Sequence, residues 1–215
     1  MGNSMRTRHG ALALIALVIA LGASGCVGWE VSKAPPKGQE VGTGGGASLS
    51  PAGAERIKET ARAEFDWSSG HLRLADVGIP DPDDHPQAVS ALDRDRPIAV
   101  TVTAPHTTID VPAERIFPYV EAGSDELGEL WLSIRAGSDA ELASLMREYS
   151  AIAGAENDGS DAWIESFESD PEATCNTLGY NTAVGTASGL QIWLEASCDW
   201  DPEPRRFLSV HLAPL

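Results

Sequence analysis

"ELWLSIRAGSDAELASLMREYSAIAG", residues 129–154, is the stretch that decides the fold of this chain. Apolar and polar residues alternate over 130–134, a pattern typical of a half-buried strand. Ser138 and Glu141 then stand at the spacing of a capping box, and this motif predicts the start of a helix. Apolar residues follow at helical spacing until Gly154, which suits the end of a helix. The stretch therefore predicts a strand that leads into a helix covering a sheet.

Downstream of this unit, the chain is predicted to form strands joined by turns at "ASG" (187–189) and "DPEP" (201–204). The predicted strands are "DAWIESFES" (161–169), "TLGYNTAVGTA" (177–187), "LQIWLEASCDW" (190–200) and "RRFLSVHLAP" (205–214).

Upstream of the unit, helices and strands are mixed. Ser50 can cap a helix that starts at Pro51, with Ile57, Ala61 and Phe65 on one face. The remaining upstream predictions are a loop over 66–96 with a short helix at 86–92, a strand at 98–103, and one or two helical turns in "VPAERIFPYVEAG" (111–123), where Pro118 would break a longer helix. These mixed elements predict an α+β fold over residues 50–215, a single small domain whose mostly antiparallel sheet has helices packed on one face.

The net charge of the chain is -17. A surface this acidic repels phosphate backbones, so we expect no nucleic acid partner. It also repels anionic lipid headgroups, which counts against membrane adhesion through a basic patch.

The N-terminus carries an export signal. "MGNSMRTRHG" is basic, "ALALIALVIAL" (11–21) is apolar, and small residues lead to Cys26. Residues 5–26, and "ASGC" in particular, resemble the lipobox signal peptide of bacterial lipoproteins, although Ala23 stands where that motif usually has Leu.

The resemblance to lipoproteins implies that residues 1–25 are a signal peptide. It also implies that Cys26 becomes the first residue and carries a diacylglycerol with its fatty acyl chains, such as palmitate. Two such chains make a stable anchor. The expected location is the cell membrane, lipid-anchored on its extracytoplasmic face. The alternative is an uncleaved membrane helix from Gly10 to Trp29, which could just span a bilayer.

Residues 26–49 are rich in Gly, Ser and Pro, which predicts a flexible tether between the anchor and the domain. With Cys26 assigned to lipid, the chain has two further cysteines, Cys175 and Cys198. Disulfides persist outside the cytoplasm, so these two are predicted to pair.

Two searches for chemistry give weak candidates. Asp81, Asp83, Asp84 and His85 in the acidic loop could bind a metal ion, but aspartates beside prolines are ordinary in solvated turns, so no metal or other cofactor is expected. No G-x-S-x-G, S-x-x-K or H-E-x-x-H motif is present, and no catalytic residue is predicted. A triad of His106, Asp110 and some serine stays open.

The alternation of the predicted strands gives a more informative candidate. Side chains that point away from the apolar set include aromatic and charged residues, and these form the candidate binding face: Trp131, Arg135, Trp193, Glu195 and His211. Such a mixture is typical of recognition surfaces. Aromatic cross-strand pairs also stabilise sheets without a partner, so packing remains the alternative.

The sequence therefore predicts a lipid-anchored cell-envelope protein without enzymatic activity that binds an unknown protein or small ligand. An envelope hydrolase and a purely structural lipoprotein are the alternatives.

Overall fold

The structure, a computed structural model, describes residues 47–81, 83–155, 159–175, 179–200 and 204–215. The predicted signal peptide, the lipidated Cys26 and residues 26–46 of the tether lie outside the described residues. Leu49, which the sequence places in the tether, is fully buried, and its N–H donates to the carbonyl of Val77. The domain therefore includes a few residues before Ser50.

The described residues form two sheets and their connecting helices, and all of them belong to one compact unit. The helices are α1 (Pro51–Thr60), η1 (Leu74–Val77, a 3-10 helix), α2 (Asp139–Ala153), α3 (Ser160–Ser169) and α4 (Pro171–Thr174). The strands are β1 (Arg62–Asp66), β2 (Val89–Ser90), β3 (Ile98–Thr103), β4 (Thr108–Ala113), β5 (Arg115–Tyr119), β6 (Glu129–Ala136), β7 (Tyr180–Asn181), β8 (Gln191–Asp199) and β9 (Arg205–Ala213).

The larger sheet has the order β2-β5-β6-β9-β8-β7 and is antiparallel throughout. The smaller sheet has the order β1-β3-β4, with β1 parallel to β3 and β3 antiparallel to β4. The predicted α+β class with a mostly antiparallel sheet is confirmed. No helix among the described residues combines the length and the apolar character needed to cross a bilayer.

The two sheets share one stretch of chain, which passes from β4 to β5 at Glu114. The N–H of Glu114 donates to the carbonyl of Ser133, while the register pairs Arg115 with the same Ser133. Two residues thus face one, as in a β-bulge, and such a bulge bends the strand that carries it. The bend lets the chain leave the smaller sheet and enter the larger one.

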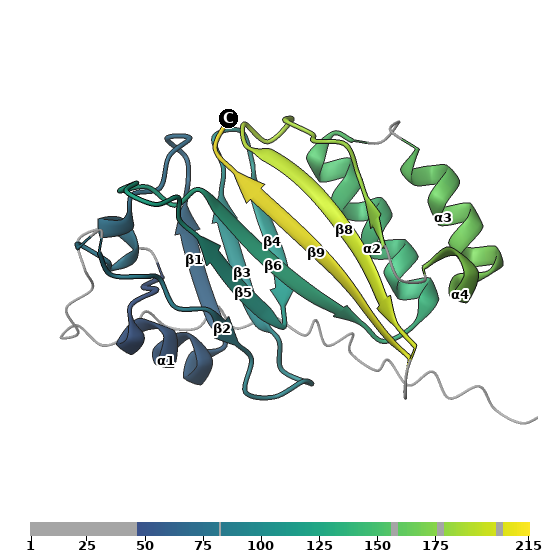
Figure 1. Ribbon diagram of the computed structural model, residues 1–215, viewed down its shortest axis with the longest axis horizontal. Coiled ribbons are helices and arrows are strands. Elements are labelled where there is room, and N and C mark those ends of the chain that lie inside the picture. The colour runs from purple at the N-terminus through teal and green to yellow at the C-terminus, as the bar shows by residue number, and fades with distance from the viewer. Residues whose placement is uncertain (1–46, 82, 156–158, 176–178, 201–203) are drawn as a thin grey trace, which may run out of the picture. The chain divides into compact units, whose positions relative to one another are not determined.

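One face of the larger sheet is closed by the rest of the domain. Helix α2 packs against β8 and β9, and β4 packs against β6. In Figure 1, α2 lies behind β8 and β9, and β3 and β4 lie behind β5 and β6. The side chains on this face are at most 3% exposed: Leu130, Leu132, Ile134, Ile192, Leu194, Ala196, Leu208, Val210 and Leu212. The predicted core faces of these three strands are confirmed.

The ends of α2 follow the sequence signals. The Ser138 hydroxyl accepts a hydrogen bond from the N–H of Glu141, and Gly154 ends the helix with a φ of 75°. The Glu141 carboxylate reaches back to the N–H of Gly137, one residue before the usual partner in a capping box. The predicted helix at the centre of the chain is confirmed, with the predicted cap residues.

Helix α1 begins as predicted but is shorter. Ser50 caps it by accepting from the N–H of Gly53. Ala61 takes a left-handed conformation at the C-terminal end, with a φ of 52°. The chain then enters β1, so Phe65 is buried from a strand and not from the helix.

Residues 161–169 form helix α3 and not the predicted strand. The buried residues Ile164 and Phe167 are three positions apart, a spacing that suits one face of a helix. The rest of the downstream pattern agrees with prediction in β8, β9 and the turn over Thr186–Gly189. Of the predicted strand 177–187, residues 177 and 178 lie outside the described residues, and Tyr180–Asn181 is the part of 179–187 that forms a strand.

The predicted helical turns at 111–123 and the predicted helix at 86–92 are also wrong. The first segment forms the end of β4 and all of β5, and the second contains the short strand β2. Pro112 lies on β4, an edge strand of the smaller sheet. Pro118 lies on β5 beyond the reach of β2, which pairs only with Arg115 and Ile116. Proline is tolerated at sheet edges, so it does not exclude a strand here.

Candidate binding site

The second face of the larger sheet carries a row of rings. The strand register places four of them directly opposite one another across β5, β6, β9 and β8. We call this set the ring row: Phe117, Trp131, His211 and Trp193. In Figure 1 this face is turned toward the viewer, and none of the described helices or strands crosses in front of it.

The rings of the row are stacked against one another. The ring centroids are 5.3 Å apart for Trp131 and His211 and 4.8 Å apart for Trp193 and His211, with interplanar angles of 16° in both pairs. Phe117 adds a tilted contact with Trp131 at 4.8 Å. These spacings are close to the distance of about 4.8 Å between neighbouring strands. The rings therefore stand on the sheet with their faces toward one another.

His211 is the centre of the site. Its Nδ1 lies 2.6 Å from Oε1 of Glu129, and its Nε2 lies 3.7 Å from Oε2 of Glu195. The residue is 7% exposed, and Nε2 has no hydrogen-bond partner. The imidazole therefore lies between two carboxylates, close to Glu129 and farther from Glu195.

Charged and aromatic side chains flank the ring row on both sides. Tyr119 lies directly opposite Glu129, and its side chain is 60% exposed. On the other side of the row, Arg115 is exposed and lies opposite Ser133. Further along, the guanidinium of Arg135 lies over the Phe207 ring at 5.6 Å. Trp131 itself is 37% exposed, so the row is reachable from solvent.

Four of the five residues predicted for the candidate binding face meet in this site: Trp131, Trp193, Glu195 and His211. Arg135 lies on the same face but contacts Phe207 and not the row. Sequence reasoning missed Phe117, Tyr119 and Glu129. The first two lie in the segment that Pro118 led us to interpret as helical turns. Phe117 and Tyr119 stand on either side of Pro118 and follow the apolar Ile116, and this alternation is a strand pattern that could have revealed them.

The acidic loop does not assemble a metal site. Asp83, Asp84 and His85 line an open pocket of about 380 Å³ that also includes Ser50. Oδ1 of Asp81 accepts from the N–H of Asp83, a turn interaction that aspartate commonly makes. In the part of the chain that the structure describes, no three His, Cys, Asp or Glu side chains lie close enough to hold a metal ion.

The triad that the sequence left open does not form. His106 is exposed, and its backbone N–H donates to the carbonyl of Ser188. Oδ1 of Asp110 instead accepts from the hydroxyl of Thr101 at 2.7 Å. Within the described ranges, no hydrogen bond joins the imidazole of His106 to Asp110.

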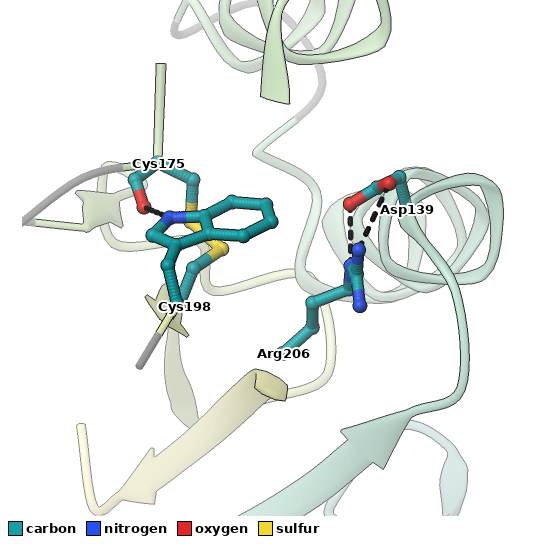
Figure 2. The surroundings of a disulfide bond; sticks show 5 residues. Asp139, Cys175, Cys198 and Arg206 are labelled. Carbon is teal, nitrogen blue, oxygen red and sulfur yellow. Dashed lines mark hydrogen bonds and ion pairs between the residues drawn. A yellow bond between two sulfur atoms is a disulfide. The ribbon is translucent and has the colours of Figure 1, made fainter. Parts of the chain in front are cut away.

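Cys175 and Cys198 form a disulfide, as predicted, with their Cα atoms 5.6 Å apart (Figure 2). Cys175 ends α4 and Cys198 lies on β8, so the bond fastens the α3–α4 segment to the sheet. The indole N–H of Trp200 donates to the carbonyl of Cys175 at 2.9 Å. Figure 2 also shows Arg206 paired through two hydrogen bonds with Asp139, at the start of α2.

Comparisons with protein-family models, with curated proteins and with solved structures found no match to this chain.

Proposed function

We propose that this chain is a lipid-anchored protein of the cell envelope whose uncovered sheet face binds a partner without catalysing a reaction. The observation that carries the binding role is the ring row, a stacked set of large side chains flanked by carboxylates and arginines on a sheet face that none of the described helices and strands covers.

Two features support the extracytoplasmic location. The N-terminal sequence has the order of a lipoprotein signal, basic and then apolar, ending at Cys26. The other two cysteines form a disulfide, a bond that persists in oxidising compartments and is rare in the cytoplasm. A single cysteine is then left over, and it is the one at the end of the signal.

The composition of the uncovered face supports binding. Interface cores are enriched in Trp, Tyr, Phe and Arg, and Trp, Tyr and Arg supply most binding hot spots. Tyr119 and Trp131 are 60% and 37% exposed, in contrast to the buried opposite face of the same sheet. A large side chain kept exposed in this way contributes little to folding.

The stack also favours a second candidate function, a purely structural lipoprotein. Each aromatic pair of this kind stabilises a protein by about 0.5–1.5 kcal/mol without any partner. A binding protein has a partner over this face in the cell, whereas a purely structural lipoprotein does not. This difference can be measured.

The anchor is tested by the intact mass of the protein extracted from membranes. We expect a chain that lacks residues 1–25 and is heavier by a diacylglycerol, and we expect Cys26→Ser to abolish both changes. A full-length, unmodified mass would contradict the proposed anchor.

The binding role is tested by photo-crosslinking in intact cells. A photoreactive amino acid replaces Tyr119 in one variant and Leu92 in another, because Leu92 is 73% exposed and lies outside the strands that carry the ring row. We expect a crosslinked species from position 119 and a much weaker one from position 92. Equal yields from both positions, or none from 119, would favour the structural alternative.

A further inference from the structure

We infer that the partner of the ring face is a second copy of this chain, docked face to face about a two-fold axis that runs along the ring row. This inference rests on the proposed binding function and names its partner. In a symmetric pair of this kind, each surface must be complementary to itself.

The first argument is the distribution of charge on the two sides of the row. Glu129 lies on one side of the row, two positions before Trp131 on β6, and its side chain is 25% exposed. Arg115, two positions before Phe117 on β5, lies on the other side and is exposed, and Glu195 lies on that same side on β8. A uniformly cationic partner would meet Arg115, and a uniformly anionic one would meet Glu129. The face fits a partner that carries both signs, and it carries both itself.

The second argument is geometric. On each strand, the next outward residue on either side of the row is two positions away. A two-fold axis along the row places the outward residue on one side, in one copy, over the outward residue on the other side, in the second copy. Because Tyr119 and Arg115 lie on the same strand at equal distances from Phe117, the axis places Arg115 of one copy over Tyr119 of the other. Glu129 is the direct cross-strand neighbour of Tyr119, so the same guanidinium reaches its carboxylate. Each pair of copies then gains two cation–π contacts and two ion pairs.

The third observation concerns the side chain of Arg115. Among the described residues, no ion pair or side-chain hydrogen bond engages its guanidinium, while its backbone pairs with Ser133 and Ser90. Other arginines of the sheet are engaged, such as Arg205 with Asp199 and Arg206 with Asp139. A guanidinium beside an aromatic row is a frequent anchor of an interface.

The size of the face fits a weak pair. Four strands about 4.8 Å apart and the three outward rows that the axis superposes, about 6.8 Å apart, give roughly 400 Å² per copy before side chains are counted. This is about half of the roughly 800 Å² per partner of a standard interface and is in the range of transient complexes. The charge of -17 on the whole chain opposes association, but at physiological salt it is screened beyond about 8 Å, whereas contacts across the face are not.

The experiment uses the full chain in the membranes of a bacterial host, expressed as two copies with different epitope tags. A photoreactive amino acid at position 119 of one copy reports capture of the other tag. We expect the wild type to give a crosslinked product that contains both tags. We expect Arg115→Glu to lower its yield at least about tenfold, since loss of one partner of an interface charge pair weakens binding by more than that.

The decisive variant combines Arg115→Glu with Glu129→Arg, which exchanges the two signs. We expect Glu129→Arg alone to abolish the product and the double variant to restore most of it. Since Glu129→Arg also removes the contact with His211, thermal unfolding of each variant checks the fold. Arg94→Glu, a reversal of an exposed charge in a turn outside the strands of the sheet, is the matched control and should leave the yield unchanged.

A product with both tags that survives Arg115→Glu, or a double variant that restores nothing, would overturn the two-fold arrangement. Capture of a different protein from position 119 would overturn the second copy as partner and leave the proposed binding function in place. Capture of nothing would contradict both.

Discussion

Leu132 and Trp131 are neighbours on β6, yet they belong to opposite faces of the larger sheet, and the two faces use large side chains differently. Leu132 is fully buried on the covered face, with Val210 and Ile116 as its cross-strand neighbours, whereas Trp131 is 37% exposed. The covered face buries apolar side chains against other elements of the domain. On the uncovered face, the rings contact mainly one another. Burial therefore holds the fold together on one side of the sheet and leaves the side chains of the other side exposed.

Leu132→Ala is expected to have the largest effect, because it removes packing from the covered face. Truncation of a fully buried leucine costs about 2–5 kcal/mol. Urea denaturation followed by circular dichroism measures the change in the free energy of unfolding. A loss below about 1 kcal/mol would show that the covered face is not the main source of stability.

Replacement of both Cys175 and Cys198 by Ala is expected to lower the free energy of unfolding by about 3 kcal/mol, from the chain-entropy relation for a closed loop of this length. The sequence separation of the two cysteines is 23 residues. The disulfide links the end of α4 to β8, so this change tests how much the bond contributes to holding α3 and α4 against the larger sheet. The wild type in reductant is the matched control and should reach the same stability as the variant. If reductant leaves the wild type unchanged while the variant is destabilised, the loss comes from packing and not from the bond.

Trp131→Ala is expected to cost only about 1–2 kcal/mol, because it removes two ring contacts from a side chain that is already 37% exposed. The same urea titration compares it directly with Leu132→Ala. A loss as large as that of Leu132→Ala would mean that the ring row is a second core, and this would favour the structural lipoprotein over a binding face.

Tyr149→Phe is expected to have the smallest effect at neutral pH, about 1 kcal/mol, because it removes one hydrogen bond. Tyr149 is 2% exposed, and its hydroxyl donates to the carbonyl of Asp110 at 2.8 Å, which links α2 to β4 inside the covered layer.

The same tyrosine gives a pH test. Burial, with help from the charges of Glu148 and Asp110, raises the pKa of the Tyr149 hydroxyl above the ordinary value of 10.0. The folded state therefore keeps this proton while the unfolded chain loses it. Stability from this group is complete below pH 10 and falls as the pH rises further. Urea titrations at pH 7 and pH 11 should show a smaller alkaline loss in Tyr149→Phe than in the wild type. Tyr119→Phe, an exposed control, should behave as the wild type does.

The parts of the fold that the sequence predicted correctly are those with strong local signals. The cap at Ser138, the stop at Gly154 and the alternation in β6, β8 and β9 each depend on interactions within a few residues. The outward set Trp131, Trp193 and His211 followed from the same alternation. Their stacking depends on register between distant strands, which no single segment encodes.

The errors have identifiable physical causes. Helix α3 was interpreted as a strand because Trp163, Ile164 and Phe167 are compatible with both periods over so short a segment. Strand β5 was interpreted as helical turns because proline is tolerated at a sheet edge, and edges are a property of the assembled sheet. That error hid Phe117 and Tyr119. Glu129 was missed because its role appears only once His211, 82 residues further along the chain, lies beside it.

The bulge at Glu114 constrains how this chain can change in length. Buried residues occupy odd positions in β4, as in Ile109, Val111 and Ala113, but the buried residue of β5 is Ile116. The extra residue at the bulge therefore changes the buried positions from odd numbers in β4 to an even number in β5. Deletion of Glu114 would leave Ala113, Arg115 and Ile116 in simple alternation, so Ile116 would stay inward and Phe117 outward, but the bulge that bends the chain between the two sheets would be lost. A deletion of one residue within β4 or β5 would instead exchange the two faces beyond it, so single-residue changes should be tolerated at the bulge and not inside the strands.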